Sequence, residues 1–121
     1  MTLRPRPTAA ELVEAVGEFL ERDVVGREEL PGRVSFHARV AVNVLGMVER
    51  ELTLGPELEA AERTRLCELL GHDGEADALT AELARAVRDG SLDERRDEVT
   101  AVVRESVRAK LLVANPRYVE A

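Results

Sequence analysis

The first candidates for chemistry are polar side chains within the apolar segment 34–54. His37 could act as a general base, but proton transfer needs a second group within reach, and the segment does not reveal one. Arg39 and Arg50 could hold a carboxylate or phosphate through paired hydrogen bonds, with Asn43 as a further contact. We therefore predict no catalytic residue, and take Arg39, Asn43, Arg50 and His37 as candidate ligand-binding residues.

Helical geometry divides these four residues into two groups. At about 100° per residue, Arg39, Asn43 and Arg50 share one narrow stripe, called below the polar strip. His37 lies instead inside an apolar arc of roughly 240°, which predicts a core histidine with satisfied nitrogens. The polar strip has two interpretations: a solvated or helix-linking strip, or an anion-binding one. An arc this wide indicates the central helix of a bundle or part of a subunit interface.

Signatures of metal, nucleotide and acyl-carrier sites are weak or missing in the sequence. Neither histidine follows a glutamate by three residues, as a di-iron bundle requires. Cys67, Glu68, His72 and Asp73 crowd one predicted helix end without a matching second pair, so we predict no metal site. Glycine-rich phosphate loops and a nucleophile elbow are missing. Ser91 is predicted to cap a helix rather than to carry a prosthetic group. We expect no cofactor.

Composition narrows the classes of function. The chain has 121 residues, 45% of them apolar and 34% charged, as expected for one globular domain. Its net charge is −7 and neither half is basic, which argues against a nucleic-acid partner. The single cysteine suits a reducing compartment. We expect a cytoplasmic protein, since we find neither a signal peptide nor a run long enough to span a membrane.

The positions of proline and glycine residues predict where the helices begin and end. Gly26, Gly55, Gly71 and Gly90 follow apolar periodic runs, where helices commonly end. Pro56 suits the first turn of a new helix, and Thr8 to Glu11 fits a capping box. We predict an all-α fold: a single five-helix bundle over residues 1–121, with the second helix central and short tails. The helices are expected at about residues 8–25, 32–54, 56–70, 75–88 and 92–114.

Three segments together resemble a bacterial family of short, all-helical proteins of unknown function. They are Arg6–Leu12, Phe36–Ala41 with Glu49–Leu52, and Ala114–Tyr118. Members of that family are often encoded beside aminoglycoside-phosphotransferase-like kinases and acyl-CoA dehydrogenases. The resemblance spans nearly the whole chain and implies a metabolic context. It implies no catalytic residue, because its motifs carry no known chemistry.

Two hypotheses about function follow. The first is a non-catalytic helical interaction or regulatory module that associates with a metabolic enzyme, either phosphotransferase-like or an acyl-CoA dehydrogenase, and that forms a homodimer. The second is a small bundle that binds or acts on an anionic metabolite such as an acyl-CoA or a phosphorylated compound. In the second, the polar strip would bind the ligand and His37 would be the base. We favour the non-enzymatic hypothesis.

Overall fold

The computed structural model describes residues 5–120, and this part of the chain is helical and contains no strand. The all-α prediction is therefore confirmed. The longest and central helix is α2, which contributes residues to both compact units of the chain, 1–54 and 55–121. Residues 1–4 and 121, which belong to the predicted tails, lie outside the described residues. In chain order the elements are α1 (Ala9–Asp23), α2 (Gly32–Leu70), α3 (Ala76–Asp89), the 3-10 turn η1 (Asp93–Arg95), α4 (Arg96–Ala114) and α5 (Arg117–Glu120).

The predicted break at Gly55 and Pro56 is wrong, because residues 32–54 and 56–70 belong to one continuous helix. Proline lacks an N–H, so Pro56 removes one hydrogen bond from the helix and crowds the preceding turn. Good helix formers such as Leu54 and Glu57 flank the pair and continue the helical path on both sides. The pair instead marks, in sequence, the boundary between the two compact units.

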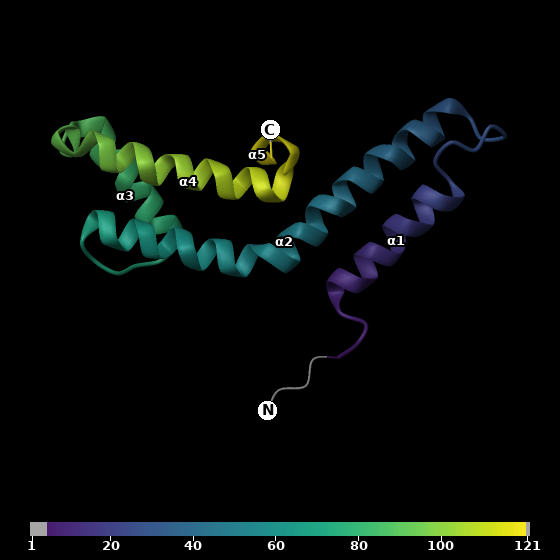
Figure 1. Ribbon diagram of the computed structural model, residues 1–121, viewed down its shortest axis with the longest axis horizontal. Helices are drawn as coiled ribbons and strands as arrows, with labels where there is room; N and C mark the ends of the chain where they lie inside the picture. The colour runs from purple at the N-terminus through teal and green to yellow at the C-terminus, as the bar shows by residue number, and fades with distance from the viewer. Residues whose placement is uncertain (1–4, 121) are drawn as a thin grey trace. The chain divides into compact units, whose positions relative to one another are not determined.

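The first unit is a hairpin in which α1 runs antiparallel to the N-terminal part of α2 (Figure 1). Thr8 begins α1 with the predicted capping box: its hydroxyl accepts from the Glu11 N–H, and the Glu11 carboxylate accepts from the Thr8 N–H. Gly26, with φ of 78°, turns the chain after α1. Its N–H donates to the Ser35 hydroxyl at 3.0 Å, which ties the turn to the start of α2.

The second unit has a leucine core. Leu66 and Leu69 of α2 pack with Leu79 and Leu83 of α3, and Leu66 and Leu79 are each only 1% exposed. Partly buried side chains of the following elements close the cluster: Leu92, Val99 and Val102. Because the core draws on α2, α3 and α4, it fixes the arrangement of these elements within the unit.

Two polar contacts join α2 to later elements of the second unit. The Ser106 hydroxyl of α4 donates to the Glu62 carboxylate at 2.7 Å. Arg95 of η1 donates to the Leu69 carbonyl at 2.9 Å, which satisfies one of the carbonyls that a helix leaves unpaired in its last turn. These bonds hold α4 against the C-terminal part of α2.

The connections of the second unit depart in part from prediction. Gly71 and Gly90 both adopt φ of 82°, which confirms two more of the predicted glycine helix ends. The last long helix does not start at residue 92, because the 3-10 turn over residues 93–95 precedes α4. Ser91 is not its N-cap: its N–H donates to the Asp89 carboxylate and its hydroxyl to the Ala86 carbonyl. Ser91 thus completes the end of α3.

Within residues 5–120, none of the helices combines the length and the apolar character needed to cross a lipid bilayer.

Candidate functional site

His37 is exposed, so the prediction of a core histidine is wrong. The apolar arc of α2 is wider than the face covered in the first unit, and His37 lies on the uncovered part. Its ring lies beside that of Phe36, with centroids 5.6 Å apart and the planes tilted by 58°. The imidazole is therefore a surface group on an apolar face.

The polar strip runs along α2 as its spacing predicts, since Asn43 follows Arg39 by four residues and Arg50 follows Asn43 by seven. Arg39 and Asn43 are exposed, whereas Arg50 is partly buried. Gly46 leaves room for the Arg50 side chain: a Cβ added at Gly46 would meet Nη1 of Arg50 at 3.3 Å. His37 does not belong to this strip. Ligand binding at these residues stays a prediction.

The apolar face of α1 is open to solvent over much of its length. Leu12, Val16 and Phe19 repeat at helical spacing and are 53%, 50% and 50% exposed. We call these three residues the α1 stripe. Half-exposed side chains of this size in a row are unusual for a helix that has buried its apolar face, since an amphipathic helix ordinarily turns that face to the core. Within the first unit, the α1 stripe is therefore an exposed apolar surface.

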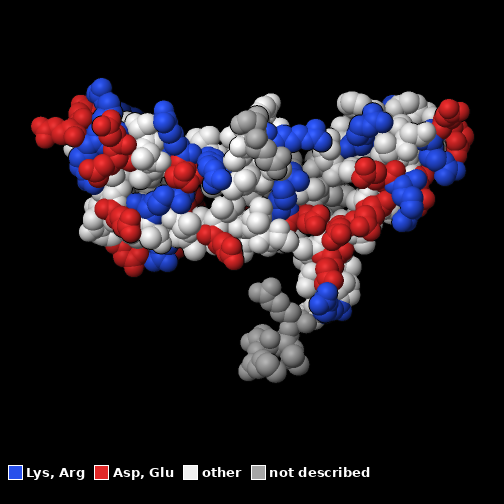
Figure 2. All heavy atoms as spheres, viewed as in Figure 1, with Lys and Arg blue, Asp and Glu red and all other residues white. Residues whose placement is uncertain are grey.

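A row of carboxylates follows the same helix on a different side (Figure 2). The row comprises Glu11, Glu14, Glu18 and Glu21, whereas Arg22 is the one basic residue within α1. The pKa of Glu14 is raised above its ordinary value, mainly by the charge of Glu49 on α2 and next by that of Glu18. The α1 stripe therefore lies on a helix with a strongly acidic side.

A second exposed apolar stripe lies on α2, within the first unit. Phe36, Val40, Val44, Met47 and Val48 recur at spacings of three and four residues, and each is at least 36% exposed. We call these five residues the α2 stripe. Among the described residues of the first unit, Ala38 alone is buried. The apolar side chains of the hairpin are therefore exposed or only partly buried, with the exception of Ala38.

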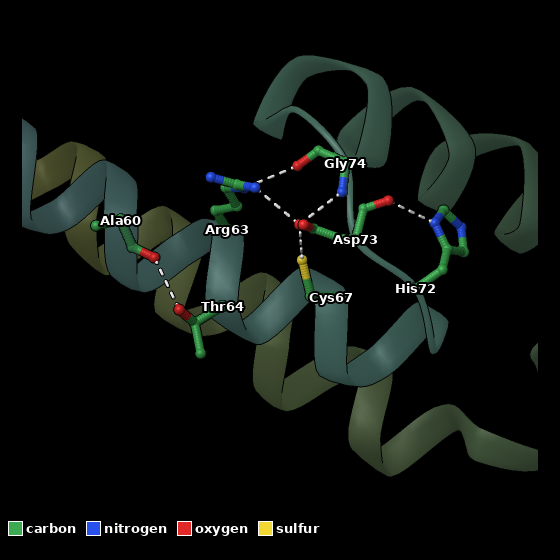
Figure 3. Close-up of polar contacts among 7 residues, drawn as sticks. All are labelled: Ala60, Arg63, Thr64, Cys67, His72, Asp73 and Gly74. Carbon is green, nitrogen blue, oxygen red and sulfur yellow. Dashed lines mark hydrogen bonds and ion pairs between the residues drawn. The ribbon is translucent and has the colours of Figure 1, made fainter.

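Asp73 organises the turn between α2 and α3 in the second unit (Figure 3). One carboxylate oxygen, Oδ1, accepts from the Arg63 guanidinium at 2.8 Å, from the Gly74 N–H at 2.8 Å and from the Cys67 thiol at 3.5 Å. Arg63 also donates to the Gly74 carbonyl at 2.8 Å. The Arg63 hydrogen bond is the main reason why the pKa of Asp73 lies below its ordinary value. These hydrogen bonds stabilise the turn between α2 and α3.

His72 joins the same turn to α3. Its Nδ1 lies 2.9 Å from the Asp73 carbonyl and its Nε2 lies 2.8 Å from both carboxylate oxygens of Glu82. The carbonyl can only accept, so Nδ1 carries a proton, and a proton on Nε2 as well would suit the carboxylate. The pKa of His72 is accordingly raised, mainly by the bond to the Asp73 carbonyl and next by Glu82.

Three of the four residues weighed as metal ligands in the sequence, Cys67, His72 and Asp73, make side-chain contacts at this turn. Asp73 accepts from Cys67, and His72 contacts Glu82, which lies ten residues further along the chain. Over residues 5–119, whose side chains the structure describes, His, Cys, Asp and Glu form no group of three or more that could hold a metal ion.

Sequence reasoning missed the α1 stripe as a candidate surface, because it assigned the apolar face of the first helix to the core of one bundle. For the wide arc of the second helix it left two interpretations open, the central helix of a bundle or part of a subunit interface. The Asp73 cluster and the pairing of His72 with Glu82 were missed as well. They depend on how tightly the chain turns after Gly71, and no residue spacing in the sequence reveals that turn.

Comparison with known proteins identifies a family. A family model described as "Domain of unknown function (DUF6285)" matches residues 28–118, which is well over half of the chain, and the chain belongs to this family. No curated protein matches the chain, and no solved structure does. The match begins after α1, at the turn that precedes α2, and ends within α5.

Proposed function

We propose that this member of the family is a non-catalytic helical interaction module that docks on a metabolic enzyme through the α1 stripe. The observation that carries the proposal is the half-exposure of Leu12, Val16 and Phe19 in one row. A contiguous apolar patch rimmed by polar residues is typical of protein–protein interaction sites. Nothing in the polar strip adds the second group that catalysis by His37 would need.

The charges along α1 favour one kind of partner surface. Glu11, Glu14, Glu18 and Glu21 flank the apolar side chains with negative charge. Complementary potentials steer association and suppress wrong partners. The α1 stripe therefore suits an apolar patch with a basic rim on the partner. We take as candidates the two enzyme classes expected from the sequence resemblance, an aminoglycoside-phosphotransferase-like kinase and an acyl-CoA dehydrogenase.

Co-purification with these two enzymes tests the proposal. Each candidate is co-expressed with tagged full-length chain, as wild type and as Val16→Glu. Val107→Glu serves as the matched control, because Val107 is a valine of α4 that is 51% exposed, almost the same as Val16. The proposal predicts that one enzyme co-purifies with the wild type and with Val107→Glu but is lost with Val16→Glu.

Two results would count against the proposal. One is the absence of a complex with either enzyme, with or without its substrates. The other is a complex that Val16→Glu and Val107→Glu weaken equally, since the partner would then not recognise the α1 stripe. Circular dichroism of each variant shows whether the helices are retained.

A further inference from the structure

The α2 stripe is separate from the face of α2 that is partly covered within the hairpin. Val34, Ala38, Ala41 and Leu45 repeat at spacings of three and four residues and are buried or partly buried, so they mark the covered face. Val40 and Val44 lie on another side of the helix and are 43% and 49% exposed. The α2 stripe is thus an apolar helix face that lacks cover in the first unit.

Charge is distributed unevenly along this part of α2. Residues 32–48 carry Arg33, His37 and Arg39 and no carboxylate, whereas Glu49 and Glu51 follow on either side of Arg50. His37 precedes Val44 by seven residues, and Glu51 follows Val44 by seven. Seven residues are close to two helical turns, so all three positions lie on the same side of the helix.

Of His37 and Glu51, Glu51 is the more informative about what packs on the α2 stripe. At about 100° per residue it falls between Val40 and Val44, within the α2 stripe, and it is exposed. A carboxylate within an apolar face weakens that face as a docking site unless the partner offers a donor. His37, exposed at the mirror position about Val44, is such a donor on a second copy of the same helix.

We propose that a second copy of this chain packs on the α2 stripe, antiparallel and about a two-fold axis near Val44. This register places His37 opposite the partner's Glu51, and Val40 opposite the partner's Val48. A two-fold interface makes each such contact twice. The segment from residue 36 to residue 52 presents about 25 Å of helix to its partner. The homodimer uses residues of α2 rather than those of the α1 stripe, so it goes beyond the enzyme docking proposed above.

The mass of the full-length chain, measured by light scattering and sedimentation over a range of concentrations, tests the dimer. The wild type should be a dimer, and Val44→Glu should be a monomer because it buries a charge at the axis. The matched control is Val103→Glu: Val103 is a valine of α4 that is 44% exposed, and this variant should stay dimeric. Val16→Glu should stay dimeric too, which separates this test from that of enzyme docking.

A charge swap tests the register. His37→Glu should raise the dissociation constant at least about tenfold, because it sets two carboxylates against each other. Adding Glu51→Lys should restore the wild-type value, since each carboxylate introduced at position 37 would then face an ammonium group at position 51 of the other copy. Both positions are exposed in the single chain, so neither change should unfold it.

Three results would overturn the proposal. They are a wild type that stays monomeric at every concentration, a dimer that Val44→Glu leaves intact, and a charge swap that fails to restore association. A monomeric wild type that still binds its enzyme through Val16 would overturn the dimer alone and leave the proposed function standing.

Discussion

The imidazole of His72 and the carboxylate of Glu82 lie 2.8 Å apart and connect the end of α2 to α3. Their residues are ten apart in the sequence, and the contact forms because the chain turns sharply at Gly71, where φ is 82°. The carbonyl of Asp73 accepts from the other ring nitrogen. This arrangement favours the protonated imidazole, so we expect it to couple the stability of the second unit to pH.

The first prediction concerns that coupling. The pKa of His72 is raised above its ordinary value of 6.5, so the folded state binds the proton more tightly than the unfolded state does. The resulting stability is fully present below the unfolded pKa and is lost as pH rises through the folded pKa. Urea unfolding at a series of pH values from about 6 to 8 should show this loss in the wild type.

The two histidines provide a matched control for the pH prediction. His72→Gln should remove most of the pH dependence of the second unit in this window. His37→Gln should keep it when the protein is diluted to the monomer, because His37 lies in the other unit and its proposed contact with Glu51 exists only in the dimer. Equal pH dependence in the wild type and in His72→Gln would contradict the role given to His72.

A second prediction concerns the leucine core. Leu66 is 1% exposed and belongs to the α2–α3 cluster, so Leu66→Ala should lower the free energy of unfolding by about 2–5 kcal/mol. Leu12→Ala removes the same atoms from a side chain that is already half exposed, and should cost much less. Equal losses in urea unfolding would show that the second unit is not organised around Leu66.

A third prediction concerns the continuity of α2. If the helix passes through Pro56, then Pro56→Ala restores a backbone donor inside the helix and should stabilise the protein, by up to about 3 kcal/mol. Gly90→Ala should have the opposite effect, because Gly90 has φ of 82°. A destabilising Pro56→Ala, measured by thermal unfolding, would indicate that the helix ends at this position.

How much of the fold could be predicted depended on whether a signal was local. The capping box of Thr8 and Glu11 and the glycine ends at Gly26, Gly71 and Gly90 depend on neighbouring residues, and the sequence predicted all of them. Gly55 and Pro56 carry the same local signal for a break, yet the helix continues through them. Propensity is a weak prior, and flanking helix formers can override a single unfavourable pair.

The candidate site was less predictable, because exposure depends on which faces find partners. Helical geometry correctly placed His37 on the apolar arc of α2. The geometry of one helix does not reveal how much of that arc other elements cover. The same limit applies to Val16, whose helical spacing suggested a core position, and to Val44, whose arc left a core position and a subunit interface both open. Both valines are about half exposed. Only the three-dimensional arrangement distinguishes a core face from an open one.

A fourth prediction tests the alternative use of the polar strip. If the polar strip binds an anionic metabolite, then an acyl-CoA or a nucleotide should raise the melting temperature of the wild type, because a ligand that binds the folded state stabilises it. Arg39→Ala should abolish the shift, while Arg108→Ala, a change of another exposed arginine, should retain it. A screen of CoA esters and phosphorylated compounds without any shift would remove this interpretation.

The most direct test of the proposed docking surface is thiol labelling at the α1 stripe. Val16→Cys and Val107→Cys are each introduced with Cys67→Ala, and labelling rates are measured with and without the co-purifying enzyme. Both thiols should react at similar rates in the free protein, since the two positions are 50% and 51% exposed. In the complex, only the thiol at position 16 should be protected. Equal labelling of the two positions in the complex would contradict docking through the α1 stripe.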